Sequence, residues 1–176
     1  MASQQIIFAG FGGQGILSMG KFLAYAGMDA NMEVSWLPSY GPEMRGGTAN
    51  CSVVLSDTPV GSPIVTKPDT VVVMNRPSLE KFEDMVVPGG LIIIDSDLVD
   101  RMPKRDDVKV IAIPAQSEAD KISSKKIANM ILLGALVKET GIVTMDEITA
   151  SLKDHGKEKF FELNKEALKA GEEYVK

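Results

Sequence analysis

The feature of the sequence that limits the fold most is an apolar run followed directly by a glycine-rich turn. The run covers residues 4–10, and the turn reads GFGGQG over residues 10–15. A continuous run of β-forming residues is typical of a strand buried on both faces of a sheet, and the apolar spacing over residues 13–28 indicates a helix. Glycines allow positive φ and the close approach of another group. The segment therefore predicts the β-turn-α unit that begins a Rossmann-like fold.

The same alternation continues along the chain. Five further apolar runs predict strands over residues 32–38, 48–56, 69–75, 90–96 and 108–114. Helices are predicted around residues 78–85, from Ser123 or Ser124 to Thr140, from a capping box at Thr144 to Gly156, and over residues 158–174. Strands that alternate with helices predict an α/β protein, a three-layer α/β/α sandwich. The turns and the extra strand within residues 38–66 indicate a mostly parallel but mixed sheet. We expect one domain over residues 1–176, with C-terminal helices from about residue 125.

The composition argues against several classes of function. Acidic residues outnumber basic ones, 24 to 19, so no broad nucleic-acid surface is expected. The longest apolar run, IANMILLGALV, is shorter than a membrane span needs, and MASQQIIFAG lacks the features of a secretory signal. A single cysteine, Cys51, cannot supply an internal disulfide, an iron–sulfur cluster or a thiolate zinc site. We expect a cytoplasmic protein that binds neither membrane nor nucleic acid.

The glycine turn admits more than one interpretation. Its glycines satisfy G-x-G-x-x-G, and the free N–H groups and dipole of the next helix favour a phosphate or carboxylate. A dinucleotide site also needs an acidic residue at the end of the second strand, where this sequence has Trp36-Leu37-Pro38. Asp29 and Glu33 fall at the other end of that strand. The turn therefore predicts an anion site or a close-packing turn rather than a dinucleotide site.

A second unusual segment, LPSYGPEMRGGTANC, covers residues 37–51 between two strands. Loops positioned by a rigid sheet often carry function. Tyr40, Glu43 and Arg45 are its chemically capable members, and the guanidinium of Arg45 suits a carboxylate or phosphate, including a 2′-phosphate. Gly46 and Gly47 would let backbone N–H groups join it. Alternatively, Glu43 and Arg45 pair with each other or with a partner chain.

Residues capable of catalysis or metal binding are few. The one histidine, His155, precedes Gly156 at a helix end, where a capping or dipole role is expected. Asp95 and Asp97 follow a strand and are expected to cap a turn or a helix. No His, Cys and carboxylate cluster has metal-ligand spacing, and no serine stands in a nucleophile motif. The sequence assigns no catalytic residue and no metal site to this chain, and Cys51 to the core.

Taken together, the two glycine-rich segments resemble those of a known family. The segments GFGGQGI, LPSYGPEMRGGTANCSVVLSDTPVGSPIV, DTVVVMNRPSLEKF and VPGGLIIIDS, in this order, are similar to the gamma subunits of the 2-oxoacid:ferredoxin oxidoreductases and to the gamma domain of the single-chain pyruvate enzymes. The similarity covers about residues 4–140, and YGPEMRGG makes it specific. It is greatest to the 2-oxoglutarate members, while pyruvate, branched-chain and indolepyruvate versions share the pattern.

The resemblance implies one subunit of a complex that converts a 2-oxoacid and coenzyme A to acyl-CoA and CO2 and reduces ferredoxin. It implies alpha and beta partner subunits, and in some versions a ferredoxin-like delta subunit. Thiamine diphosphate, Mg²⁺ and the iron–sulfur clusters would be held by the partner chains, and no cofactor by this chain alone. The isolated chain would be inactive, and whether it forms a homo-oligomer stays open.

The expected binding or interface residues all lie in the two glycine-rich segments. They are Gly10, Gly12, Gly13, Gln14, Gly15, Tyr40, Glu43, Arg45, Gly46 and Gly47. We expect them at one edge of the sheet, in contact with the partner subunits or with the phosphates of coenzyme A. Two other interpretations stay open. One is a freestanding nucleotide- or anion-binding protein, and the other is an assembly scaffold with an exposed apolar patch around the two segments and no ligand.

Overall fold

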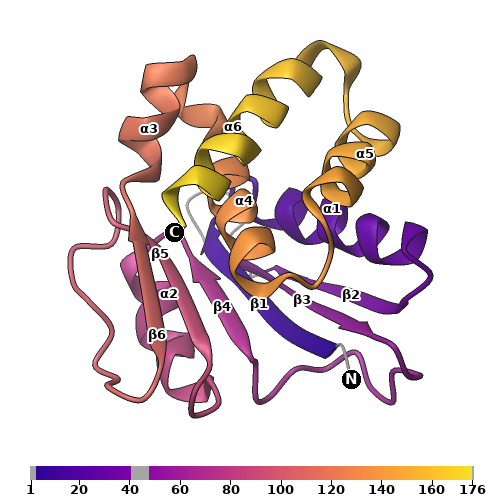
Figure 1. The fold of residues 1–176 in the computed structure, drawn as a ribbon. Helices are drawn as coiled ribbons and strands as arrows, with labels where there is room; N and C mark the ends of the chain where they lie inside the picture. The colour runs from indigo at the N-terminus through magenta and orange to yellow at the C-terminus, as the bar shows by residue number, and fades with distance from the viewer. Residues whose placement is uncertain (1–2, 41–47, 176) are drawn as a thin grey trace.

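A six-stranded sheet forms the centre of the molecule (Figure 1). The structure is a computed structural model that describes residues 3–40 and 48–175. The strand order is β2-β3-β1-β4-β5-β6. The strands are β1 (Ser3–Phe11), β2 (Glu33–Tyr40), β3 (Thr48–Ser56), β4 (Thr70–Val73), β5 (Leu91–Asp95) and β6 (Lys109–Ile113).

The sheet is mixed, as the sequence predicts. Strands β1, β4, β5 and β6 are parallel, whereas β3 runs antiparallel to both β1 and β2. The carboxyl ends of β1, β4 and β5 therefore share one edge. Phe11 at the end of β1 pairs with Thr48 at the start of β3, and Tyr40 at the end of β2 pairs with Ala49. The segment that joins β2 to β3 thus leaves and re-enters the sheet beside the glycine turn.

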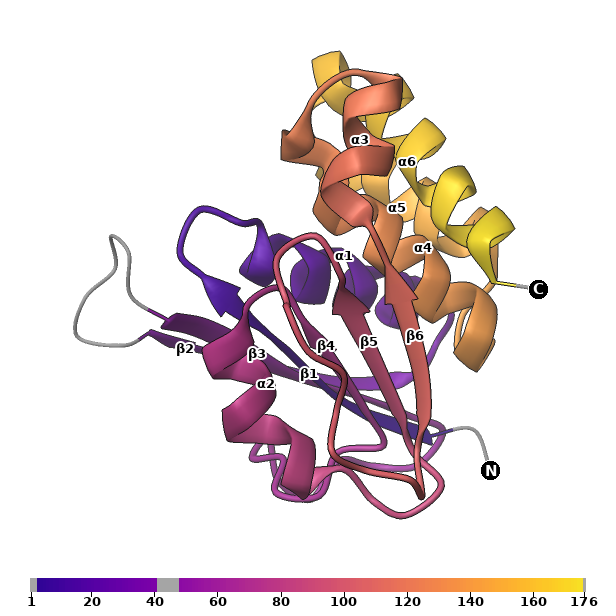
Figure 2. The same cartoon turned by 90° about the vertical axis from the view of Figure 1, so that its left-hand side faces the viewer.

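The helices divide unequally between the two faces (Figures 1 and 2). On one face lie α1 (Ile16–Asp29), α3 (Ala115–Ile122), α4 (Ala128–Thr140), α5 (Met145–His155) and α6 (Phe161–Tyr174). The other face carries α2 (Arg76–Phe82). Short 3-10 turns are formed by Glu83–Met85, Lys125–Ile127 and Glu158–Phe160. The three-layer α/β/α prediction is confirmed, with the first face more heavily covered.

Two apolar clusters hold these layers together. Because successive side chains of a strand point to opposite faces, Ile6 and Phe8 join the cluster under α1 and α4, while Ile7 joins the cluster under α2. Helix α4 packs beneath α6, and all its residues from 128 to 137 are buried. Core burial therefore accounts for the longest apolar run of the sequence. None of the described helices is long and apolar enough to cross a membrane.

Several element boundaries differ from the sequence prediction. Helix α1 begins at Ile16 rather than at residue 13, because the glycine turn occupies the intervening residues. Strand β2 continues through Pro38 to Tyr40, which an edge strand tolerates because a proline there needs no hydrogen bond on its open side. Helix α3 was not predicted from the sequence. The caps at Thr144 and Gly141 are confirmed: the Thr144 hydroxyl accepts from the Glu147 N–H at 3.0 Å, and Gly141 has φ 62°.

Candidate functional site at the carboxyl edge of the sheet

The carboxyl ends of β1 and β4 lie side by side, at the point where the connections that follow the strands change from one face of the sheet to the other. After β1 the chain forms α1 on one face, and after β4 it forms α2 on the opposite face (Figure 2). Neighbouring strands whose connections leave in opposite directions open a crevice between their carboxyl ends, where α/β proteins bind ligands. The glycine turn borders this crevice, as its sequence position predicts.

Gln14 ties the glycine turn to the crevice. Its side-chain Oε1 accepts from the backbone N–H of Phe11 at 2.6 Å, and its Nε2 donates to the carbonyl of Met74, just after β4, at 3.2 Å. Gly13 and Gly15 have φ of 89° and 76°, so these positions need glycine. A methyl group at Gly10 would lie 2.7 Å from Cδ1 of Ile16. The turn is therefore a tightly packed structure in its own right.

The first turn of α1 begins at Gly15, its N-cap, which has no side chain to cap the helix. The first N–H groups of any helix lack intrahelical partners, and those of Ile16, Leu17 and Ser18 have no hydrogen-bond acceptor within residues 3–40 and 48–175. Asn129 at the start of α4 donates to the Gly15 carbonyl at 3.2 Å, which fixes the turn against the helical layer. This geometry is compatible with the anion site expected from the sequence, which stays a prediction.

A cleft of about 300 Å³ lies beside Gln14. It is lined by Phe11, Gln14, Met74, Asn75, Arg76, Pro77, Leu98 and Asp100. Four of the eight are apolar, and two of these, Phe11 and Leu98, are 37% and 42% exposed. These two side chains place exposed apolar surface at a cleft that Gln14 of the glycine turn also lines.

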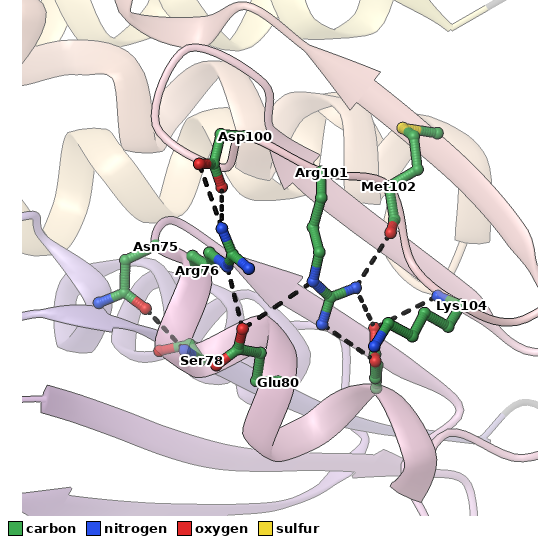
Figure 3. A network of polar contacts seen from close by, with 9 residues as sticks. Asn75, Arg76, Ser78, Glu80, Asp100, Arg101, Met102 and Lys104 are labelled. Atoms are coloured by element: carbon green, nitrogen blue, oxygen red, sulfur yellow. Dashed lines mark hydrogen bonds and ion pairs between the residues drawn. The ribbon is translucent and has the colours of Figure 1, made fainter.

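Asn75 supplies an unused hydrogen-bond donor at this cleft (Figure 3). The residue is 2% exposed. Its Oδ1 accepts from the Ser78 N–H at 2.8 Å and so caps α2. Its Nδ2 is buried and has no hydrogen-bond partner in the described part of the chain. A buried donor left unpaired costs about 1–3 kcal/mol, so an acceptor brought by a ligand or a partner chain would be stabilised here.

Two arginines form ion pairs at or near the cleft (Figure 3). Arg76 donates to Glu80 at 3.0 Å and to Asp100 at 3.3 Å, and the hydrogen bond to Glu80 is the main cause of its raised pKa. Arg101 makes a bidentate pair with Glu83, at 3.0 and 3.1 Å, and this hydrogen bond raises the pKa of Arg101. Since Glu83 is 5% exposed, the second pair fixes the loop that carries Leu98 and Asp100.

Asp95 and Asp97 cap α3, in line with the capping role expected for them. Asp95 accepts from the N–H of Ala115 at 3.2 Å and from Gln116 Nε2 at 2.8 Å, and Asp97 accepts from the N–H of Ser117 at 2.7 Å. Burial is the largest influence on Asp95 and raises its pKa, while the bond from Gln116 opposes that rise. Both carboxylates therefore serve the structure.

The predicted site residues are thus only partly described. The turn residues Gly10, Gly12, Gly13, Gln14 and Gly15 border the crevice, and the backbone of Tyr40 lies at the same edge of the sheet. The predicted residues Glu43, Arg45, Gly46 and Gly47 lie outside the described residues. Sequence reasoning did not single out Asn75, although an asparagine two residues before Pro77 is a helix-start signal that could have identified its capping role.

Two other residues contribute no chemistry to this site. Cys51 is buried, as predicted, and burial raises its pKa to about 12. His155 stacks on Tyr25 at 3.8 Å between ring centroids and lies 3.7 Å from Asp29, so it joins α5 to α1 in addition to ending its helix. Within residues 3–40 and 48–175, no three His, Cys, Asp or Glu side chains group as a metal site.

Comparisons with known proteins agree with the resemblance. The family model described as pyruvate ferredoxin/flavodoxin oxidoreductase matches residues 5–174. Ketoisovalerate oxidoreductase subunit VorA of Methanothermobacter thermautotrophicus is 40% identical over 98% of this chain, which spans only 36% of VorA. The 2-oxoglutarate synthase subunit KorC of Methanocaldococcus jannaschii is 36% identical, over 98% of this chain and 94% of KorC. The gamma subunit of keto/oxoacid ferredoxin oxidoreductase from Geobacter sulfurreducens superimposes with a TM-score of 0.86 at 29% identity, covering 98% of both chains.

Proposed function

The chain belongs to the pyruvate ferredoxin/flavodoxin oxidoreductase family, and on this premise we propose that it is the gamma subunit of a multisubunit 2-oxoacid:ferredoxin oxidoreductase. The complex would convert a 2-oxoacid and coenzyme A to acyl-CoA and CO2, with ferredoxin as the electron acceptor. Alpha and beta subunits, with or without a ferredoxin-like delta subunit, would be its partners.

The substrate we propose is 2-oxoglutarate. Its support is that KorC relatives match this chain over nearly their whole length. A branched-chain 2-oxoacid is the second candidate, because the VorA relatives have the higher identity. The chain spans about a third of the length of these VorA relatives.

The one cysteine of this chain does not fit the iron–sulfur clusters of such an enzyme. Its one cysteine is buried and its thiol has a pKa of about 12, so it cannot serve as a cluster ligand. We therefore assign thiamine diphosphate, Mg²⁺ and the iron–sulfur clusters to the partner chains, and to this chain a role in assembly and in shaping the entry for coenzyme A.

The observation that carries this role is the Asn75 Nδ2 donor, which has no partner among the described residues and belongs to a residue that lines the cleft together with Gln14 of the glycine turn. Helix α1 follows that turn without a side-chain cap from Gly15, and Phe11 and Leu98 supply exposed apolar surface. An acceptor-bearing group, either a carbonyl of a partner segment or the anionic end of coenzyme A, would satisfy these donors.

Reconstitution of the complex tests the proposal. The chain is combined with its alpha and beta partners, and ferredoxin reduction is followed with 2-oxoglutarate, 2-oxoisovalerate, pyruvate and indolepyruvate. We expect 2-oxoglutarate to give the highest kcat/KM and Arg45→Ala to raise the KM for coenzyme A or weaken assembly. If the chain does not associate with such partners and binds NAD(P)H alone, the proposal is wrong and the glycine turn is a dinucleotide site. If Arg45→Ala changes neither the KM for coenzyme A nor the assembly of the complex, Arg45 is not part of the site.

A further inference from the structure

The charges at the cleft beside Gln14 do not favour an anion. Two of the described residues that line it are charged, Arg76 and Asp100, and they pair with each other at 3.3 Å. Arg76 also pairs with Glu80 at 3.0 Å (Figure 3). One positive and two negative charges give this group a net charge of −1. An anion that entered the cleft would therefore meet an excess of negative charge.

The start of α1 does not line this cleft. Gln14 of the glycine turn is a lining residue, whereas residues 15–18, which form the beginning of the helix, are not. Gln14 uses its own polar atoms within the chain, because its Oε1 accepts from the Phe11 N–H and its Nε2 donates to the Met74 carbonyl. The favourable effect of a helix N-terminus on an anion is confined to its first turn. The cleft and the start of α1 are therefore separate features.

The cleft instead offers a neutral donor beside apolar surface. Asn75 Nδ2 is buried and has no acceptor among the described residues. Phe11 and Leu98 are partly exposed, and Met74 and Pro77 line the same cleft. Its volume of about 300 Å³ is at the lower end of the range for small-molecule pockets. These properties suit an apolar side chain and the peptide group next to it better than a nucleotide.

The donor of Asn75 is covered in the isolated chain, so an acceptor reaches it only when a side chain of the cleft turns aside. Phe11 and Leu98 are exposed enough to do so, and side chains at interfaces commonly change rotamer on binding. Because water does not hydrate the covered donor, a new acceptor does not have to replace a hydrogen bond to water. Such a bond therefore contributes more to association than one to a donor that was hydrated before.

We propose that the cleft receives an apolar side chain of a partner subunit together with a backbone carbonyl beside it, and that coenzyme A binds outside the cleft. The carbonyl accepts from Asn75 Nδ2, and the apolar side chain packs against Phe11 and Leu98. The exposed carboxylates of Glu80 and Asp100 favour a basic residue next to it in the partner segment. This inference rests on the proposed function, because it names the contact by which the gamma subunit holds its partner.

Titration of the chain against its purified alpha and beta partners measures the dissociation constant, and ferredoxin reduction by the saturated complex gives the KM for coenzyme A. We expect Leu98→Ser and Asn75→Ser each to raise the dissociation constant about tenfold and to leave that KM unchanged. Met102→Ser is the matched control for Leu98→Ser. Met102 lies in the same connection between β5 and β6 and is 56% exposed, but it does not line the cleft, so its replacement should leave the dissociation constant unchanged.

Asp100→Asn distinguishes a partner segment from an anion by the sign of its effect. For a partner segment with a basic residue, it should raise the dissociation constant about twofold, since the lost pair is exposed. A lower KM for coenzyme A in Asp100→Asn, or a higher one in Asn75→Ser at unchanged affinity, would show an anionic occupant and overturn the inference. If the wild-type complex is active and neither Leu98→Ser nor Asn75→Ser changes its affinity, the inference alone is wrong. If the wild-type chain does not associate with the partners, the proposed function fails as well.

Discussion

Asn75→Ser is expected to stabilise the isolated chain while weakening the complex. Serine is about as good an N-cap as asparagine, so the hydrogen bond from the Ser78 N–H is retained. The unpaired buried Nδ2 is removed, which relieves about 1–3 kcal/mol. Two heavy atoms fewer leave a small void that costs about 0.5–1 kcal/mol. The balance is a gain of about 1 kcal/mol, or roughly 2–4 °C in Tm for a chain of this size.

Urea unfolding of the isolated chain measures this balance, with Asn75→Ala as the matched control. Alanine removes the same donor and also the cap, so it should be less stable than the serine variant by about 0.5–2 kcal/mol. In the reconstituted complex, Asn75→Ser should weaken assembly or raise the KM for coenzyme A about tenfold, because the acceptor then loses its donor. A serine variant that is less stable than the wild type by 1 kcal/mol or more would refute the reasoning, since it would mean that Nδ2 already has a partner.

Three further predictions concern the framework around the site. Arg101→Ala should lower the urea midpoint clearly, because the Glu83 side chain, which is only 6% exposed, would lose its bidentate partner. Arg76→Ala should change the midpoint little, because both of its acidic partners are at least half exposed. Gly171→Ala should destabilise the chain by about 1–3 kcal/mol, as measured by thermal unfolding, because the methyl group would meet the Ile131 carbonyl and lie 2.9 Å from the Ala135 nitrogen; Gly61→Ala, with open space around it, is the control. Cys51 should resist iodoacetamide in the folded chain at pH 9 and react in urea. Its pKa is about 12 in the folded chain and 9.0 for a thiol in water, so stability should fall as pH rises from about 9 toward 12. Rapid labelling of the native chain would contradict the burial of Cys51.

Strand positions and helix ends followed from local signals. The run over residues 48–56 predicted β3 with the bounds that the structure has, because alternation of apolar and polar residues is a property of the strand itself. The Thr144 cap and the Gly141 stop were predicted because a cap bonds to its own helix. Helix α3 gave no such signal. Its caps, Asp95 and Asp97, come from the end of a strand about twenty residues earlier, so no local pattern marks its start.

The sequence by itself determined that this chain is an α/β protein with a mixed sheet and a glycine turn after its first strand. The order of its motifs showed the resemblance to its family. Those features depend on the period of apolar residues and on backbone conformations that glycine alone adopts readily. Only the tertiary structure decided that Gln14 of the turn reaches Met74 and that the buried Nδ2 of Asn75 has no acceptor among the described residues. These are contacts between segments about sixty residues apart, and their geometry depends on how β1 and β4 pack side by side rather than on either segment alone.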